Sequence, residues 1–187
     1  MRRIVTGHDS DGHSKVVEDG RPPRWHDYTS VPDLSVAVLW STKAGVPTNH
    51  SGADPTLDVD SVVPGPGETR AMRLVFPPDS AMMSPDIDLA AFGAEHMRNA
   101  PGLAELFEPD GNHKTPSIDY SILIEGELWL ETDDGEHTKL APGDVVVQNG
   151  TRHAWRNRSD TPAVMVSVLV GVDDAADRAV AAQDGNS

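Results

Sequence analysis

Short apolar stretches separated by turn residues dominate the pattern of this chain. Several alternate between apolar and polar positions, and others are rich in β-branched residues, as strands are. Asp-Gly and Asn-Gly pairs lie between them and tolerate the positive φ angles of tight turns. The pattern therefore predicts an all-β domain. The predicted strands are Arg2–Thr6, His13–Val17, Ser35–Ser41, Thr69–Phe76, Ser117–Ile124, Glu127–Thr132, Asp144–Gln148, His153–Asn157 and Ala163–Gly171.

One segment carries helical signals instead. Leu89–Asn99 follows residues 84–86, whose Ser-Pro-Asp sequence offers a capping hydroxyl, a proline for the first turn and an early acid. The pattern ends before Pro101, which a helix does not easily include. Residues 45–67 are rich in Pro, Gly, Asp, Ser and Thr, so we expect a long loop or a mobile crossing there.

Length and composition limit the class of protein. The chain has 187 residues, which fit one domain, and a formal net charge of −15. Such a charge favours solubility and disfavours nucleic acid or an anionic membrane as a partner. Cysteine is absent, which excludes disulfides, thiolate ligands and a cysteine nucleophile. The first residues turn polar too early for a signal peptide, so we expect a cytoplasmic protein.

Two short blocks carry the candidate chemistry. Because side chains alternate along a strand, His113, Thr115 and Asp119 share one face in the first block. In the second block, His153, Trp155 and Asn157 share a face in the same way. Two imidazoles and a carboxylate suit Fe(II), and Zn or Mn also accept them. No phosphate loop or dinucleotide fingerprint is present, so we expect no nucleotide cofactor.

These two blocks resemble the signature motifs of the cupin family. The first motif places Thr115 at its second histidine and Asp119 at its usual glutamate. The second motif is matched by Gly150, His153 and Asn157. Three departures remain: Phe107 stands at the first glycine, Gln148 stands at the usual proline, and the run from Gly143 to Gly150 is one residue short.

The resemblance implies a fold and a set of ligands. The fold would be a double-stranded β-helix, the cupin jelly-roll barrel, with N-terminal strands and one short helical insertion. In domain terms we expect an N-terminal β arm over residues 1–34 and a barrel over 35–172, with its insertion at about 84–107. A C-terminal tail over 173–187, rich in Ala and Asp, is expected to be disordered.

The same resemblance implies a divalent metal, such as Fe, Zn, Mn or Ni, held by His113, Asp119 and His153. Thr115 would leave one coordination position open, as a catalytic metal needs. A small organic molecule would then be the substrate of a lyase, isomerase or dioxygenase. The residues expected to line the pocket are Thr115, Ser121, Trp155, Asn157 and Arg70.

Other interpretations of these residues remain open. The barrel is a metal-free binding module if the two histidines only make hydrogen bonds with Asp119. A metal-free enzyme would use one histidine as general base, oriented by Asp119. Arg70 either anchors a substrate carboxylate or caps its strand in solvent. His96, on the predicted helix, is placed to cover the barrel mouth.

The sequence around Gly126 bears on assembly. If Glu125 and Gly126 form a two-residue turn, Leu123 faces Leu128 across a hairpin, on the Asp119 side. The opposite face is apolar where a solvated sheet would be polar, so something covers it. We expect a homodimer through this face, and the alternative is cover by residues 1–20. The residues of the face are Tyr120, Ile122, Ile124 and Trp129.

Overall fold

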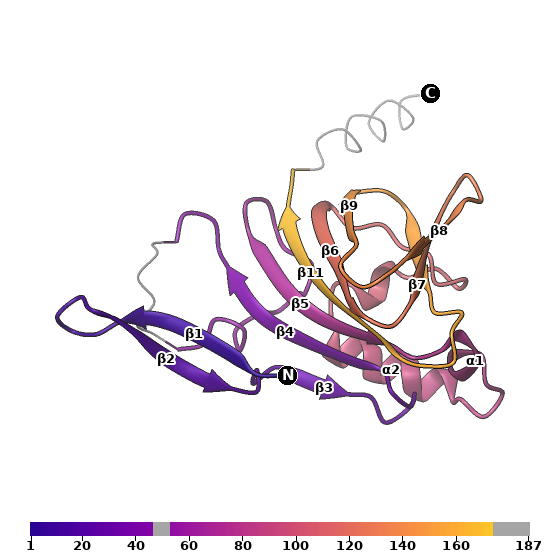
Figure 1. The fold of residues 1–187 in the computed structure, drawn as a ribbon, viewed down its shortest axis with the longest axis horizontal. Coiled ribbons are helices and arrows are strands. Elements are labelled where there is room, and N and C mark those ends of the chain that lie inside the picture. Colours follow the sequence, from indigo (N-terminus) through magenta and orange to yellow (C-terminus); the bar gives the residue numbers. More distant parts are fainter. Residues whose placement is uncertain (47–52, 174–187) are drawn as a thin grey trace.

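Two β-sheets and a separate N-terminal hairpin make up most of this molecule in a computed structural model (Figure 1). The structure describes residues 1–46 and 53–173. Apart from its first residue, the predicted C-terminal tail lies outside the described residues. Within them, no helix is long and apolar enough to cross a membrane.

The strands dominate the elements, and two of the predicted strands have the predicted bounds. They are β1 (Arg3–His8), β2 (Ser14–Gly20), β3 (Trp25–Asp27), β4 (Ser35–Thr42), β5 (Thr69–Phe76), β6 (Ser117–Glu125), β7 (Leu128–Thr132), β8 (His137–Leu140), β9 (Val145–Asn149), β10 (His153–Arg156) and β11 (Ala163–Gly171). The helices are α1 (Asp79–Met82), α2 (Leu89–Asn99) and the 3₁₀ helix η1 (Ala104–Leu106).

The two sheets form the barrel. A six-stranded antiparallel sheet has the order β3-β4-β5-β11-β6-β9, and a three-stranded sheet has the order β10-β7-β8. Consecutive strands such as β6 and β7 lie in different sheets, which is the path of a double-stranded β-helix. Apolar residues from both sheets form the core between them, which confirms the predicted all-β class. This cluster comprises Leu123, Leu128, Leu140, Ala163 and Met165.

The chain around Gly126 passes from one sheet to the other. β6 pairs with β11 and β9, whereas β7 pairs with β10 and β8. The predicted hairpin between them is therefore wrong. Leu123 and Leu128 do meet, but in the core and from opposite sheets. Gly126 has a φ of 81°, and a Cβ there would lie 2.8 Å from the backbone of Ala163, so this sharp corner needs glycine.

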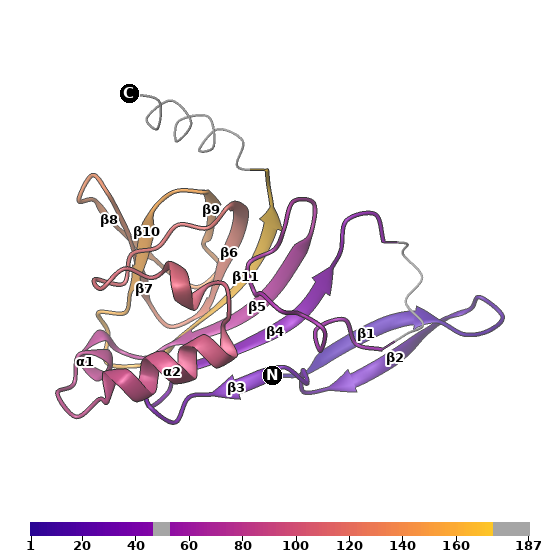
Figure 2. The ribbon, with the colours of Figure 1, turned by 180° about the vertical axis from the view of Figure 1, so that it is seen from behind.

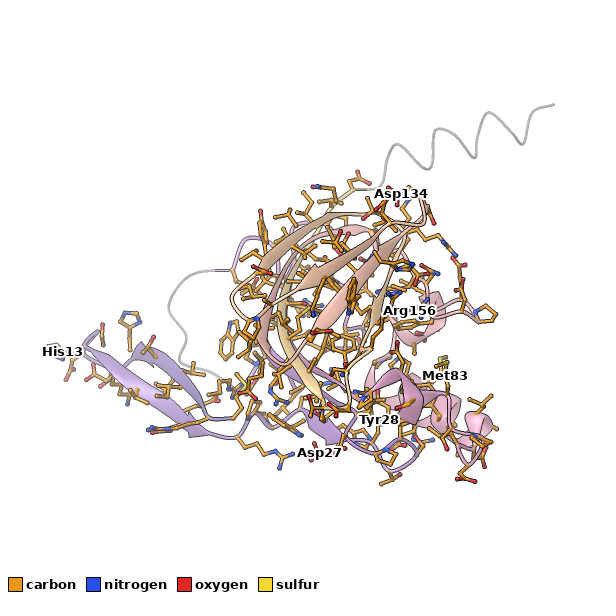
Figure 3. All side chains as sticks on the ribbon, turned by 45° about the vertical axis from the view of Figure 1, so that its right-hand side comes forward. His13, Asp27, Tyr28, Met83, Asp134 and Arg156 are labelled. Atoms are coloured by element: carbon orange, nitrogen blue, oxygen red, sulfur yellow. The ribbon has the colours of Figure 1, made fainter. Side chains whose placement is uncertain are left out.

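The hairpin of β1 and β2 extends away from the barrel, with His13 near its far end (Figures 1 and 3). Arg3 holds it to the body: its guanidinium donates to the Leu39 carbonyl at 3.0 Å and forms ion pairs with Glu18 and Asp54. The predicted 1–34 arm is therefore not one unit: β1 and β2 stand apart from the barrel, whereas β3 pairs with β4. The hairpin does not cover the apolar face of β6, where Tyr120 remains exposed.

Helix α2 has the predicted bounds but a different cap. The carboxylate of Asp88 accepts hydrogen bonds from the backbone N–H groups of Ala90 and Ala91, each at 3.0 Å. Ser84, the predicted cap, instead accepts from the Asp86 N–H in a preceding turn. Figure 2 shows α2 crossing the β3 and β4 side of the molecule. Phe92 packs there on the second core cluster, which is formed by Tyr28, Val36, Val38, Val62, Met72, Ala100, Leu103 and Leu169.

Glu95 fixes α2 to the loop between β3 and β4. Its buried carboxylate accepts hydrogen bonds from the backbone N–H groups of Thr29 and Ser30, each at 2.9 Å, and from both their hydroxyls. His26 contacts the same carboxylate at 2.8 Å. Burial would raise the pKa of Glu95, but these hydrogen bonds lower it far below its ordinary value. The next residue, His96, is thereby held in a fixed place.

The predicted loop of residues 45–67 is well packed where the structure describes it. Thr56 and Val62 have no exposed surface. The Val62 N–H donates to the Pro101 carbonyl at 2.9 Å, which joins the loop to the segment after α2. Residues 47–52 of the loop lie outside the described residues.

Candidate functional site

The two motif histidines meet inside the barrel. His113 lies just before β6, and His153 begins β10 in the other sheet. Reciprocal backbone hydrogen bonds of 2.9 and 3.0 Å form an isolated bridge between them. Their ring centroids are 4.4 Å apart, and both residues are buried. The fold therefore joins two residues that are 40 positions apart in the sequence.

Both imidazoles favour the neutral form. Burial lowers the pKa of His113 to about 4, and the neighbouring His153 contributes to this shift. Burial also lowers the pKa of His153. The His153 Nδ1 lies 2.9 Å from the carbonyl of Thr151, which only accepts, so Nδ1 carries the hydrogen and Nε2 keeps its lone pair. A neutral ring with a fixed tautomer is the form that binds a metal or accepts a proton.

Asp119 lies on β6 in the same interior. Its carboxylate accepts hydrogen bonds from the Ser117 hydroxyl at 2.6 Å and the Thr115 hydroxyl at 3.4 Å. Burial raises the pKa of Asp119, whereas the Ser117 hydrogen bond and the nearby His153 oppose that shift. Thr115, at the position of the second motif histidine, thus orients a carboxylate here.

The ligand atoms of His113, Asp119 and His153 do not all lie within 4.8 Å of one another. Among the described residues, three side chains bring one ligand atom each within 4.8 Å of one another only at Asp9, Asp11 and His13. Those three lie on the outlying hairpin (Figure 3), and exposed groups of this kind are common without an ion. The metal set of His113, Asp119 and His153 remains a prediction.

A row of rings extends from the histidine pair in both directions. Trp155 meets His153 edge to face with ring centroids 5.6 Å apart, as their shared strand face predicts. On the other side, the ring of Phe107 lies 4.4 Å from that of His113. Phe107 occupies the place of the first motif glycine, so this departure puts an aromatic cover over His113.

The helix contributes to the same row through His96. Its ring centroid lies 5.5 Å from that of Phe107, and the Tyr28 hydroxyl lies 2.6 Å from its Nδ1. Burial raises the pKa of Tyr28 and lowers that of His96. The tyrosine therefore stays protonated and donates to a neutral imidazole. His96 therefore contacts the ring row through Phe107, and its role as a cover of the barrel mouth stays a prediction.

Two of the predicted pocket residues serve other parts of the fold. The guanidinium of Arg70 donates to the Glu68 carboxylate at 2.7 Å and to the carbonyls of Ser61 and Thr69. Arg70 lines a separate groove of about 1340 Å³ beside the N-terminal hairpin. The amide of Asn157 donates to the carbonyls of Phe76 and Thr161, so it holds the turn after β10.

Other buried polar residues complete the interior. The Ser121 hydroxyl lies 2.8 Å from that of Ser167 on β11, so this predicted pocket residue is joined to its strand neighbour. Ser117 and Gln148 are site residues that the sequence did not single out for chemistry. Gln148 lies directly opposite Asp119 across β6 and β9. Gln148 stands where the cupin motif usually has a proline, and this departure was the signal in the sequence that could have identified it.

Acidic residues form ion pairs with the two arginines near the mouth of the barrel. Arg152 forms ion pairs with Glu108 and Asp133, while Arg156 pairs with Glu131 at 2.9 Å. These contacts raise the pKa of both guanidinium groups. Both arginines are therefore committed to neighbouring acids.

Comparison with known proteins places this site in a matched segment. The cupin domain model Cupin_2 matches residues 105–169, which include His113, Asp119 and His153. Phomopsin biosynthesis cluster protein C′ of Diaporthe leptostromiformis is 55% identical over 49 residues, which cover 26% of this chain and 26% of that protein. The cupin-domain-containing oxidoreductase virC of Hypocrea virens is 47% identical over 61 residues, which cover 31% of each chain.

The chain thus matches about a quarter to a third of the length of these curated relatives. A Cupin 2 conserved barrel domain protein from Salinispora arenicola CNS-205 is similar in structure, with a TM-score of 0.38 and 17% identity. That alignment covers 80% of this chain and 84% of the other. The path of the strands between two sheets, the two motif blocks and the matched domain model agree that residues 105–169 form a cupin domain.

Proposed function

We propose that this chain is a small-molecule enzyme whose barrel holds one divalent metal ion on His113, Asp119 and His153. The observation that carries the proposal is the histidine pair: the rings lie 4.4 Å apart and both have lowered pKa values. Neutral imidazoles bind metal ions, whereas imidazolium groups do not. The candidate metals are Fe, Zn, Mn and Ni.

The residues present fit such an ion in their chemistry. His113 has a buried Nδ1 without a hydrogen-bond partner among the described residues, and His153 has its Nε2 lone pair available. Asp119 supplies a carboxylate that Ser117 orients. Thr115 offers no nitrogen where the motif has its second histidine, so a ligand position would remain for water or substrate.

The ion would supply Lewis-acid or redox chemistry when bound. The chain's own contribution is to orient the donors and to limit the access of water. The Thr151 carbonyl fixes the tautomer of His153, and Ser117 fixes Asp119. Phe107 and Trp155 flank the histidines with apolar rings, which keeps the local dielectric constant low and strengthens electrostatic interactions.

Among the reaction classes open to such a site, we favour an oxidoreductase acting on a small organic molecule. Several relatives carry the name cupin-domain-containing oxidoreductase, and others are named as proteins of biosynthesis clusters. Lyases and isomerases can use the same metal ligands, and assays with candidate substrates would distinguish these reaction classes from an oxidoreductase. A cytoplasmic location belongs to the same proposal.

The roles of the donors can be tested by titrating the metal-free protein with Co(II) and recording its visible absorption spectrum. We expect a nitrogen-and-oxygen ligand spectrum that saturates at one equivalent. His153→Ala should remove it, and Thr115→His should tighten Co(II) binding by adding the missing motif ligand. Asn149→Ala, on an exposed position of β9, is the control and should match the unmodified protein. An identical titration for His153→Ala and the unmodified protein would contradict the proposal.

A metal-free binding module is the second candidate. It is favoured by one observation, that Asp119 and the two histidines are not among the groups whose ligand atoms lie within 4.8 Å of one another. Asp119 already accepts hydrogen bonds from two hydroxyls. In this case the interior would bind a small organic molecule by hydrogen bonds alone.

A further inference from the structure

The side-chain amide of Gln148 lacks a partner inside the barrel. The residue lies on β9 and is 4% exposed. Its Oε1 accepts a hydrogen bond from the Thr151 hydroxyl at 2.5 Å, but its Nε2 has no partner among the described residues. A buried amide that has left water without gaining a hydrogen bond is unfavourable. A missing partner is therefore expected at Nε2.

Gln148 faces the interior that contains the histidine pair. It lies directly opposite Asp119 in the register of β6 and β9, and such opposite residues point to the same side of a sheet. The Nδ1 of His113 is a second buried nitrogen without a partner among the described residues. The unpartnered Nε2 of Gln148, on the same side of the sheet as Asp119, therefore indicates a molecule that binds beside it.

The chemistry of the amide restricts that molecule. A side-chain NH₂ group only donates, so its partner is an oxygen or another acceptor and not a metal ion. An anionic partner would meet the Asp119 carboxylate, and the arginines that the structure describes at the barrel mouth, Arg152 and Arg156, are already paired with acids. Arg70, for which anchoring a substrate carboxylate was one of two interpretations, is engaged by Glu68. The remaining acceptors are uncharged carbonyl and hydroxyl oxygens.

We propose that Gln148 is a ligand-binding residue, which donates from Nε2 to the carbonyl or hydroxyl oxygen of an uncharged organic molecule. The inference rests on the proposed function, because it places the substrate in the same barrel. The rings of Phe107 and Trp155 on either side of the histidine pair suit a ligand that carries a flat ring. An aromatic amide such as benzamide combines these features.

The test uses the metal-free full chain, with benzamide and its anionic counterpart benzoate as probes. ¹H–¹⁵N spectra report the Gln148 side-chain NH₂ signals during each titration. We expect benzamide to shift these signals and to bind more tightly than benzoate. Gln148→Met, which keeps the length but removes the donor, should weaken benzamide binding about tenfold, as expected for one lost hydrogen bond. Asn149→Met, at the exposed neighbouring position, should bind benzamide like the unmodified chain.

Two results would overturn the assignment. One is a set of Gln148 NH₂ signals that do not respond to benzamide, as expected if a buried water satisfies the amide. The other is equal benzamide affinity in Gln148→Met and the unmodified chain. If Gln148→Met does not fold, Gln148→Leu also lacks the NH₂ group and adds no charge opposite Asp119, and the same loss is expected. The metal proposal fails separately, because the benzamide titration uses metal-free protein, whereas the metal proposal depends on the Co(II) titration of the unmodified chain.

Discussion

At the scale of single residues, burial decides the chemistry of the site. The motif spacing and strand alternation together placed His113, His153 and Asp119 on inward faces, and all three side chains are buried. Alternation also placed Asn157 there, yet its amide holds a turn because backbone carbonyls lie within reach. Arg70 is buried, but Glu68 engages it beside a separate groove and away from the histidine pair. A sequence pattern gives the direction of a side chain and leaves out the partners that the fold brings to it.

The lowered pKa of His113 makes the stability of the metal-free protein depend on pH. The unfolded chain binds a proton near the ordinary pKa of 6.5, whereas the folded chain binds it at about 4. Stability contributed by this residue is therefore present above pH 6.5 and is lost as the pH falls toward 4. The loss should reach on the order of 2 kcal/mol at pH 5. His153 acts in the same direction, and the raised pKa of Asp119 opposes both.

Urea unfolding of the metal-free protein between pH 8 and pH 5 measures this dependence. His113→Gln should give a flatter curve, since glutamine has no proton to bind in this range. Asn149→Gln, at an exposed position of β9, changes no titratable group, so it serves as control and should keep the slope of the unmodified chain. A slope unchanged by His113→Gln would mean that His113 is not held neutral by the fold.

At the scale of elements, α2 connects the N-terminal part of the barrel to the site. Leu89–Asn99 was predictable because the helical signals lie within the segment itself. Other elements depend on tertiary contacts. β8 is a polar strand with three exposed residues, so it lacks the apolar alternation that marks a strand. The predicted β6 and β7 hairpin was wrong because an apolar strand can bury its side chains in either sheet. The apolar pattern therefore does not say which strand it pairs with.

The carboxylate of Glu95 should be essential for the placement of α2. Glu95→Ala leaves the Thr29 and Ser30 backbone N–H groups without their partner, so we expect a loss of roughly 2–4 kcal/mol in the free energy of unfolding. Chemical denaturation measures it. Glu136→Ala, at an exposed turn position, should change stability little. A similar small effect for Glu95→Ala would show that α2 is held by other contacts.

Two glycines give a matched pair of opposite predictions. A Cβ on Gly171 would lie 2.0 Å from the Gly65 carbonyl oxygen, so Gly171→Ala should destabilise the protein by roughly 1–3 kcal/mol or more. A Cβ on Gly93, inside α2, would meet no atom within 4 Å. Gly93→Ala should therefore stabilise by roughly 1 kcal/mol through helix propensity. Thermal unfolding compares both, and equal effects of the two substitutions would refute the packing described for Gly171.

At the scale of the whole molecule, the outer face of β6 and β9 is apolar and exposed. Tyr120, Ile124, Val145 and Val147 are 46%, 45%, 57% and 50% exposed. Trp129, which the sequence placed in this face, lies on β7 in the other sheet, near Lys139 and Arg158. These four side chains are uncharged, in a chain whose formal net charge is −15. We propose that a second copy of the chain covers this face, as two like patches match each other.

Light scattering tests this assembly. The unmodified chain should be a dimer, and Val147→Glu should shift it to a monomer or to aggregates, because the substitution puts a charge into an apolar contact. Val16→Glu, on the outlying hairpin, is a matched control because Val16 is 55% exposed. A monomeric unmodified chain at micromolar concentration would exclude the dimer.

The central claim is that two distant motif histidines and one aspartate act together as the binding site of a divalent metal. Elemental analysis tests it most directly, on protein purified without a metal-affinity tag and reconstituted in turn with Fe(II), Mn, Ni and Zn. We predict one equivalent of at least one of these metals in the unmodified chain and none in His153→Ala, with both proteins folded by circular dichroism. The absence of a stoichiometric metal from the unmodified chain under all four conditions would contradict the claim.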